Sequence, residues 1–165
     1  MAAALLGRRL EEAGVEASVS SVGLLFDGEP ATGHGVAAMA ARGLDTSAHR
    51  SRRLRPGLLE GAELVIGMER SHVQEAVALL PAVFDRTFTL KEIIRLGEER
   101  GGRGPGESLE SWLARLHAGR RAADLLGAAG TEDVADPIGG PRRAYERTAD
   151  ELDELTTRLA HLLAG

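Results

Sequence analysis

The stretch ELVIGM (63–68) followed by ERSHVQEAVALLP (69–81) decides the fold class. The first part is a short apolar run of the kind that a buried parallel strand needs. The second part has the spacing of three and four that is typical of a helix, carried by Val73, Ala76, Val77 and Leu80. AVFDRTFTL (82–90) is the next predicted strand. Strands that alternate with helices predict an α/β fold with a small parallel sheet.

The chain before this stretch predicts helices and one further strand. MAAALLGRRLEEAG (1–14) has the pattern of a helix that ends at Gly14, but it has no Ser, Thr, Asp or Asn to cap its start. VEASVSSVGLL (15–25) alternates and is predicted as a strand, and FDGEPATGHG (26–35) as a loop. VAAMAARGLD (36–45) is predicted as a short helix, HRSRRL (49–54) as a basic exposed segment, and RPGLLEGA (55–62) as one helical turn.

The chain after this stretch predicts three helices and two loops. KEIIRL (91–96) is predicted as a short helix and GEERGGRGPGE (97–107) as a mobile, Gly-rich linker. Ser108 is positioned to cap a helix whose apolar face includes Trp112. TEDVADPIGGP (131–141) is predicted as a loop, with Pro141 as the first residue of a last helix. The Arg pairs at 120–121 and 142–143 are predicted to be solvated helix surface, and the second pair is also able to steer an acidic phosphopeptide.

The composition restricts the class of protein. The 165 residues carry a net charge of −5, which gives no nucleic-acid footprint, and no apolar run is long enough to span a membrane. There is no cysteine, so disulfides and thiolate chemistry within these residues are excluded. The five histidines show no metal-ligand spacing, and no metal or cofactor is predicted. We expect a cytoplasmic protein; the oligomeric state is not predicted.

Five stretches, in order, resemble the low-molecular-weight protein-tyrosine phosphatase family. They are MAAALLGRRLEEAGVEASVSSVG, VAAMAARGLDTSAHRSRRL, ELVIGMERSHV, FTLKEI and DPIGGPRRAYERTADELDEL. The resemblance implies a three-layer αβα fold of the phosphotyrosine protein phosphatase I type. It also implies a single domain over residues 1–165, with a helical insert at about 97–130 that compact family members lack.

The resemblance also implies a two-step phosphatase chemistry and three site residues. A Cys thiolate in a Cys-x5-Arg loop attacks phosphorus, and water cleaves the cysteinyl-phosphate. Asp136 matches the general acid that protonates the departing phenolate, and Ser21 and His49 match residues that support the phosphate loop. Each has an alternative: Asp136 as a turn residue, Ser21 as an ordinary strand hydroxyl, and His49 as a surface histidine. The substrates implied are a phosphotyrosine protein or a small aryl phosphate.

Two departures from the family bear on activity. Met1 matches the Met that follows the phosphate loop in the family. We therefore expect the first strand and the nucleophile loop to be missing from the 165 residues. Without the nucleophile we expect the 165-residue polypeptide to be inactive. A mis-assigned start of the gene accounts for this; the alternative is a non-catalytic pseudo-phosphatase that acts as a binding or regulatory module. Ile138 occupies a position where the family often has Tyr or Phe.

Overall fold

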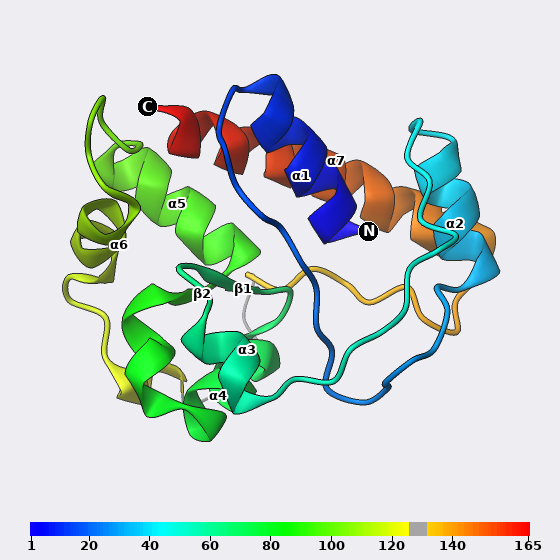
Figure 1. The fold of residues 1–165 in the computed structure, drawn as a ribbon, viewed down its shortest axis with the longest axis horizontal. Helices are drawn as coiled ribbons and strands as arrows, with labels where there is room; N and C mark the ends of the chain where they lie inside the picture. Colours follow the sequence, from blue (N-terminus) through cyan, green and yellow to red (C-terminus); the bar gives the residue numbers. More distant parts are fainter. Residues whose placement is uncertain (126–131) are drawn as a thin grey trace. The chain divides into compact units, whose positions relative to one another are not determined.

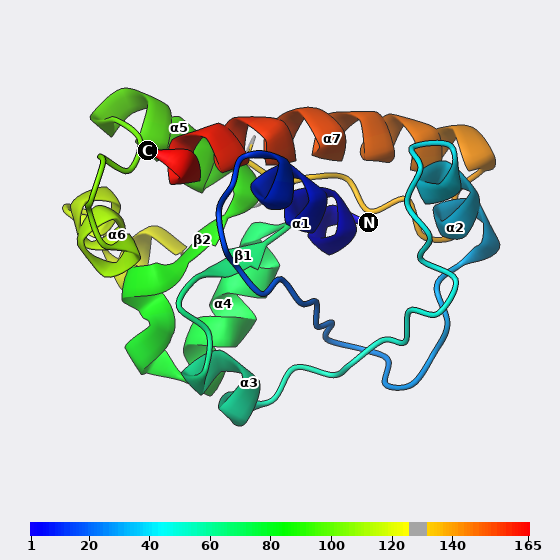
Figure 2. The ribbon, with the colours of Figure 1, turned by 45° about the horizontal axis from the view of Figure 1, so that its top comes forward.

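The computed structural model describes residues 1–125 and 132–165, and these form two compact units (Figures 1 and 2). The first unit consists of Met1–Arg53 and Ala135–Ala160. The second consists of Leu54–Val134 and His161–Gly165. The single domain predicted over residues 1–165 stays a prediction.

Three helices make up the regular structure of the first unit. They are α1 (Ala2–Glu12), α2 (Gly33–Ala40) and α7 (Arg142–Ala164), whose last four residues belong to the second unit. Gly14 adopts the positive φ of 71° that ends α1, as predicted. α2 starts three residues earlier than predicted because the Thr32 hydroxyl accepts the Gly35 N–H at 3.2 Å. α7 starts at Arg142, one residue after Pro141.

Arginines connect these helices to one another. Arg9 of α1 donates to the Asp153 carboxylate of α7 at 2.8 Å, and Arg8 donates to the Arg42 carbonyl. Arg42, just after α2, pairs with Asp150 of α7. Arg9 and Asp153 are 26% and 28% exposed, so water screens this pair less than an exposed pair, whereas in the other pair Arg42 is covered and Asp150 is 75% exposed. The three helices are therefore held by ion pairs as well as by buried apolar side chains, which are leucines in α1 and α7 and Ala38 and Met39 in α2.

The prediction of a strand at 15–25 is wrong. The segment has no regular secondary structure, and its only ladder contact is an isolated parallel bridge between Gly23 and Arg53. The alternating pattern is present, but a strand also needs a neighbour that accepts and donates ladder bonds along its length. Only one neighbouring segment contacts it in this way among the described residues, and at one position.

The second unit contains the parallel sheet. β1 (Val65–Gly67) pairs in parallel with β2 (Thr87–Thr89), with Ile66 opposite Phe88. α3 (Pro56–Glu60) precedes β1, and α4 (Arg70–Leu79) and the short 3-10 helix η1 (Pro81–Arg86) connect the two strands. The predicted strand at 82–90 is therefore 3-10 helix up to Arg86 and strand only at 87–89, and Leu90 already begins the next helix.

Apolar side chains close the connection between the strands. Leu59 of α3, Ala76 of α4 and Val83 of η1 are buried together, and Leu54, Val65 and Leu80 pack against them. The helical spacing read from residues 69–81 thus points Ala76 inward, as predicted.

Two more helices and a second 3-10 helix follow. α5 (Leu90–Arg100) extends past the predicted 91–96 because Gly97 is buried rather than part of a linker. α6 (Leu109–His117) is capped by Ser108 and buries Trp112, as predicted. η2 (Ala122–Leu125) follows. The segment predicted as a helical insert therefore contains the end of α5, α6 and η2, with irregular chain at 101–108 and 118–121, and its residues 126–130 lie outside the described residues. That it is an insert stays a prediction.

One predicted surface residue is instead buried. Arg120 has a side chain only 9% exposed and pairs with Glu92 at 2.8 Å, whereas Arg121 beside it is 78% exposed. The prediction of a solvated Arg pair on a helix is wrong for Arg120, which also lies after the end of α6. It holds for the exposure of Arg121.

Candidate functional site

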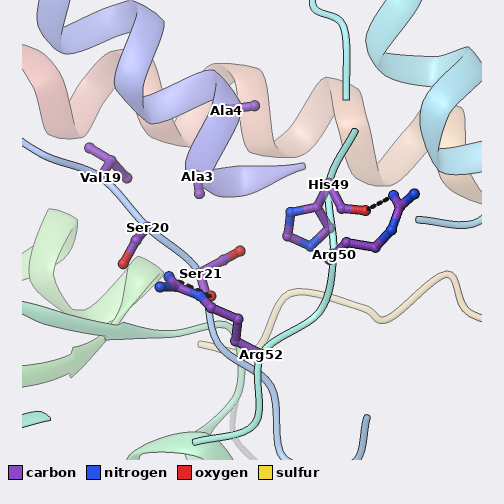
Figure 3. A pocket seen from close by; sticks show the side chains of 8 residues that line it. All are labelled: Ala3, Ala4, Val19, Ser20, Ser21, His49, Arg50 and Arg52. Atoms are coloured by element: carbon purple, nitrogen blue, oxygen red, sulfur yellow. Dashed lines mark hydrogen bonds between the residues drawn. The ribbon is translucent and has the colours of Figure 1, made fainter. Parts of the chain in front are cut away.

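A pocket of about 310 Å³ lies at the N-terminal end of α1 within the first unit (Figure 3). Three segments line it: the first turn of α1, the irregular chain at 19–21, and the basic segment at 49–52. The lining residues are Ala3, Ala4, Val19, Ser20, Ser21, His49, Arg50 and Arg52. Two of the three residues that the sequence assigns to a site, Ser21 and His49, therefore lie in the same pocket.

The lining is basic. Arg50 and Arg52 contribute two guanidinium groups and His49 an imidazole, and the lining includes no carboxylate. Arg52 donates to the Ser21 carbonyl at 3.2 Å, and Arg50 donates to the His49 carbonyl at 2.8 Å. Figure 3 shows both bonds and places the guanidinium of Arg52 beside Ser21. These bonds fix the two side chains at the pocket, and no carboxylate in residues 1–125 or 132–165 forms an ion pair with either guanidinium.

The start of α1 adds to the same field. No side chain caps this helix, and the amides of Ala4 and Leu5 are bonded to the Met1 carbonyl. A helix N-terminus favours anions through its dipole and its unpaired amides. Together with Arg50 and Arg52, this end of the helix makes the pocket suitable for a phosphate or a similar anion.

Asp136 lies in a separate loop of the first unit, between Ala135 and α7. Its Oδ1 accepts the Ile138 N–H at 2.9 Å, and the Pro137 carbonyl accepts the Gly140 N–H at 2.9 Å. Gly139 has a φ of 75°, which the tight turn requires. Asp136 is exposed and does not line the pocket, and Ile138 is 58% exposed. The local structure fits both an acid at a loop tip and a turn-forming Asp, so its role stays a prediction.

Arg50 and Arg52 line the pocket, although the sequence alone gives neither of them a site role. The sequence predicts 49–54 to be basic and exposed and gives a site role in it to His49 alone. The available signal was the spacing of two, which places residues 50 and 52 on one side of an extended segment.

The pocket lacks a thiolate nucleophile, because the 165 residues contain no cysteine. Within the described part of the chain, the Ser21 hydroxyl makes no hydrogen bond to a base that could activate it. Across residues 1–125 and 132–165, no cluster of three His, Asp or Glu side chains could hold a metal ion. The described residues thus provide an anion-binding surface and leave the nucleophile unassigned.

Comparison with known proteins identifies the class. The model of a family described as low molecular weight phosphotyrosine protein phosphatase matches residues 1–100. The chain is 31% identical, over 99% of its length and 86% of the relative's, to a protein-arginine-phosphatase of Geobacillus stearothermophilus. It resembles the solved low molecular weight protein tyrosine phosphatase from T. tengcongensis with a TM-score of 0.72 and 27% identity, over 98% of this chain and 88% of that one.

A third similarity is to the solved arginine phosphatase from Geobacillus stearothermophilus, with a TM-score of 0.68 and 29% identity, over 97% of this chain and 80% of that one. The fold is that of these relatives, which are small phosphatases. The chain belongs to the low molecular weight phosphotyrosine protein phosphatase family.

The resemblance and the three-layer α/β fold class are therefore confirmed. In the residues that the structure describes, no helix combines the length and the apolar character that crossing a membrane requires.

Proposed function

We propose that this chain is the scaffold of a protein phosphatase that removes the phosphoryl group from phosphorylated arginine. The observation that carries the proposal is the 31% identity to a protein-arginine-phosphatase over 99% of the chain. The basic pocket formed by α1, Ser21 and the 49–52 segment supports it, because a phosphoryl dianion is the ligand that such a surface favours. Phosphotyrosine is the competing substrate, supported by the similarity to the T. tengcongensis enzyme.

The proposed reaction needs a thiolate from outside the 165 residues. That thiolate attacks phosphorus, and the phosphorus–nitrogen bond of phosphoarginine breaks. The departing guanidine takes the proton of Asp136, which we propose as the general acid. Water then attacks the cysteinyl-phosphate and gives up its proton to the Asp136 carboxylate, which releases inorganic phosphate and restores the thiolate. With phosphotyrosine the same steps release a phenol.

Ser21 and His49 have supporting roles in this proposal. Both line the pocket where the anion binds, and neither is required to react. Their hydrogen bonds support the loop that contains the reacting cysteine. This support keeps the backbone amides of the loop pointed at the phosphoryl oxygens. Because the cysteine is absent from these residues, we propose that the gene extends upstream of Met1 and that the 165-residue polypeptide alone turns nothing over.

The test compares the 165-residue chain with a chain extended by the codons that precede Met1 in the genome. We expect the added codons to encode a Cys-x5-Arg loop. We expect the extended chain to hydrolyse a phosphoarginine peptide, and p-nitrophenyl phosphate serves as a general phosphatase substrate in the same assay. Faster hydrolysis of a phosphotyrosine peptide would assign tyrosine instead. A stop codon directly upstream, with a cooperative melt of the 165 residues, would favour the non-catalytic binding module. Turnover by the 165 residues themselves would refute the proposed chemistry.

Asp136 has a matched control in the same unit. Asp45 is also exposed, and its Oδ1 accepts the Ser47 N–H at 2.8 Å in the way that Asp136 accepts the Ile138 N–H. In the extended chain, Asp136→Asn should lower kcat for phosphoarginine by about 10² to 10⁴. Asp45→Asn changes the same kind of turn without touching the proposed acid and should leave kcat unchanged. Equal rates for the two variants would reduce Asp136 to a turn residue.

A further inference from the structure

Two segments beside the pocket run along one another and form a continuous surface in the first unit. The Gly23 amide donates to the Arg52 carbonyl at 2.8 Å, and the Gly28 amide donates to the Ser51 carbonyl at 2.8 Å. The Ser51 amide donates in turn to the Glu29 carbonyl, and the Arg53 amide to the Asp27 carboxylate at 3.1 Å. We call residues 22–26 together with 50–53 the docking strip.

The docking strip carries three arginines, and the carboxylate beside them, that of Asp27, accepts the backbone amide of Arg53 rather than its guanidinium. The guanidinium groups of Arg50 and Arg52 donate to backbone carbonyls, and Arg53 bonds through its backbone amide. Among the described residues, none of these three guanidinium groups forms an ion pair. A guanidinium has five N–H donors, so each has donors left for a ligand.

The same strip exposes three large apolar side chains within five residues. Leu25 is 78% exposed, Phe26 54% and Val22 41%. Single exposed apolar residues are ordinary, but a cluster beside a basic rim is typical of a binding surface. An aromatic residue and arginines are also the side chains that most often anchor protein interfaces.

We propose that the docking strip binds an acidic segment of the phosphorylated protein substrate, with an apolar side chain of that segment seated on Leu25 and Phe26. The inference rests on the proposed function, since the strip is continuous with the pocket through Arg50 and Arg52. A long polyanion is disfavoured because the chain as a whole carries a net charge of −5. A short acidic peptide matches three arginines and one apolar cluster better than a nucleic acid or an anionic membrane does.

The test uses the 165-residue chain, whose lack of cysteine lets binding be measured without turnover. The probe is a fluorescent, unphosphorylated peptide rich in Glu with one Leu, followed by anisotropy. We expect binding that weakens as salt rises and falls about tenfold with Arg53→Glu or with Phe26→Ser. The control variants are Arg121→Glu, with the same charge change at a side chain 78% exposed, and Leu79→Ser, at a residue 42% exposed in α4.

Several outcomes would overturn the proposal. These are absence of binding by a chain that melts cooperatively, equal losses in the control variants, and tighter binding of an oligonucleotide or an anionic vesicle than of the peptide. The extended chain separates this proposal from the proposed function. If the extended chain hydrolyses phosphopeptides with a kcat/KM that does not depend on their acidic residues, the docking proposal is wrong and the proposed phosphatase function stands. If the peptide binds and no turnover occurs, the strip stands and the phosphatase is wrong.

Discussion

Replacing Arg120 by methionine should destabilise the second unit strongly, because several of its elements meet at this side chain. The guanidinium bonds both carboxylate oxygens of Glu92 in α5, at 2.8 and 3.1 Å. It also donates to the Thr87 carbonyl of β2 at 2.7 Å and to the Phe84 carbonyl of η1 at 3.2 Å. Its carbon lies 4.0 Å from the centroid of the Phe88 ring. One cation thus joins α5, β2 and η1.

The magnitude follows from burial. The Arg120 side chain is 9% exposed and that of Glu92 16%, so removing the cation leaves a carboxylate largely out of water. Breaking a buried pair in this way costs about 3–5 kcal/mol. Glu92 retains the Thr89 N–H at 3.3 Å, and methionine preserves part of the contact with Phe88, so we expect the lower end, about 3 kcal/mol. That loss corresponds to a fall in Tm of roughly 10 °C for a chain of this size.

Trp112 makes the assay specific for this unit. It is the only tryptophan of the chain, it is fully buried in α6, and its indole N–H donates to the Gly101 carbonyl at 3.1 Å. Urea unfolding followed by its fluorescence therefore reports the unit that contains Arg120. Arg121→Met is the control, because Arg121 is 78% exposed and pairs only locally with Asp124. The double variant Arg120→Met, Glu92→Gln should recover about 1–2 kcal/mol of the lost free energy of unfolding, because it removes the Glu92 carboxylate that Arg120→Met leaves without a counter-charge.

A loss for Arg120→Met no larger than that for Arg121→Met would refute the reasoning. It would mean that the geometry around Glu92 contributes nothing beyond an exposed ion pair.

Three further predictions concern stability. The pKa of His117 should lie below 6.5, because burial and then Arg120 disfavour the charged ring while Asp85 and Glu92 oppose them only partly. At acidic pH the unfolded chain then binds more protons than the folded one. The contribution of His117 to the free energy of unfolding should therefore be complete above pH 6.5 and decline as the pH falls toward the pKa of the folded state. In an NMR titration, Arg120→Met should raise the pKa of His117 in the folded state. Gly67→Ala should cost about 1–2 kcal/mol by Trp112 fluorescence, since its Cβ would lie 3.0 Å from the Glu69 carbonyl oxygen, whereas Gly57→Ala meets nothing within 4 Å and should be neutral or stabilising. Thr32→Ala should cost about 1 kcal/mol by losing the cap of α2, read from helix content by circular dichroism during unfolding, and no loss would contradict the capping role.

Local patterns in the sequence predicted most of the helices correctly. Ser108 caps α6, Gly14 ends α1, and the spacing in residues 69–81 gives the buried face of α4. These features depend on residues within a few positions of each other, so the sequence alone carries them. The family, recognised from the order of its motifs, was likewise readable without a structure.

The candidate site was only partly readable. Ser21 and His49 came from the family motif, and the structure brings them to one pocket, but Arg50 and Arg52 were recognised only once that pocket was visible. A basic run has no preferred face until a neighbouring segment fixes it, and here the bond from Arg52 to the Ser21 carbonyl does so. Asp136 remains a prediction, since its loop geometry fits two roles.

What the tertiary structure alone decided are the interactions between residues far apart in the chain. Residues 15–25 alternate as a strand should, but no segment within the described ranges pairs along their length, and there they form a single bridge, Gly23–Arg53. Arg120 reads as surface in the sequence, yet Glu92, 28 positions away, and the ring of Phe88 hold it in the interior. The physical reason is the same in both cases: a backbone ladder or a buried charge is stable only when its partner is present, and the partner's position is set by the fold rather than by neighbouring residues.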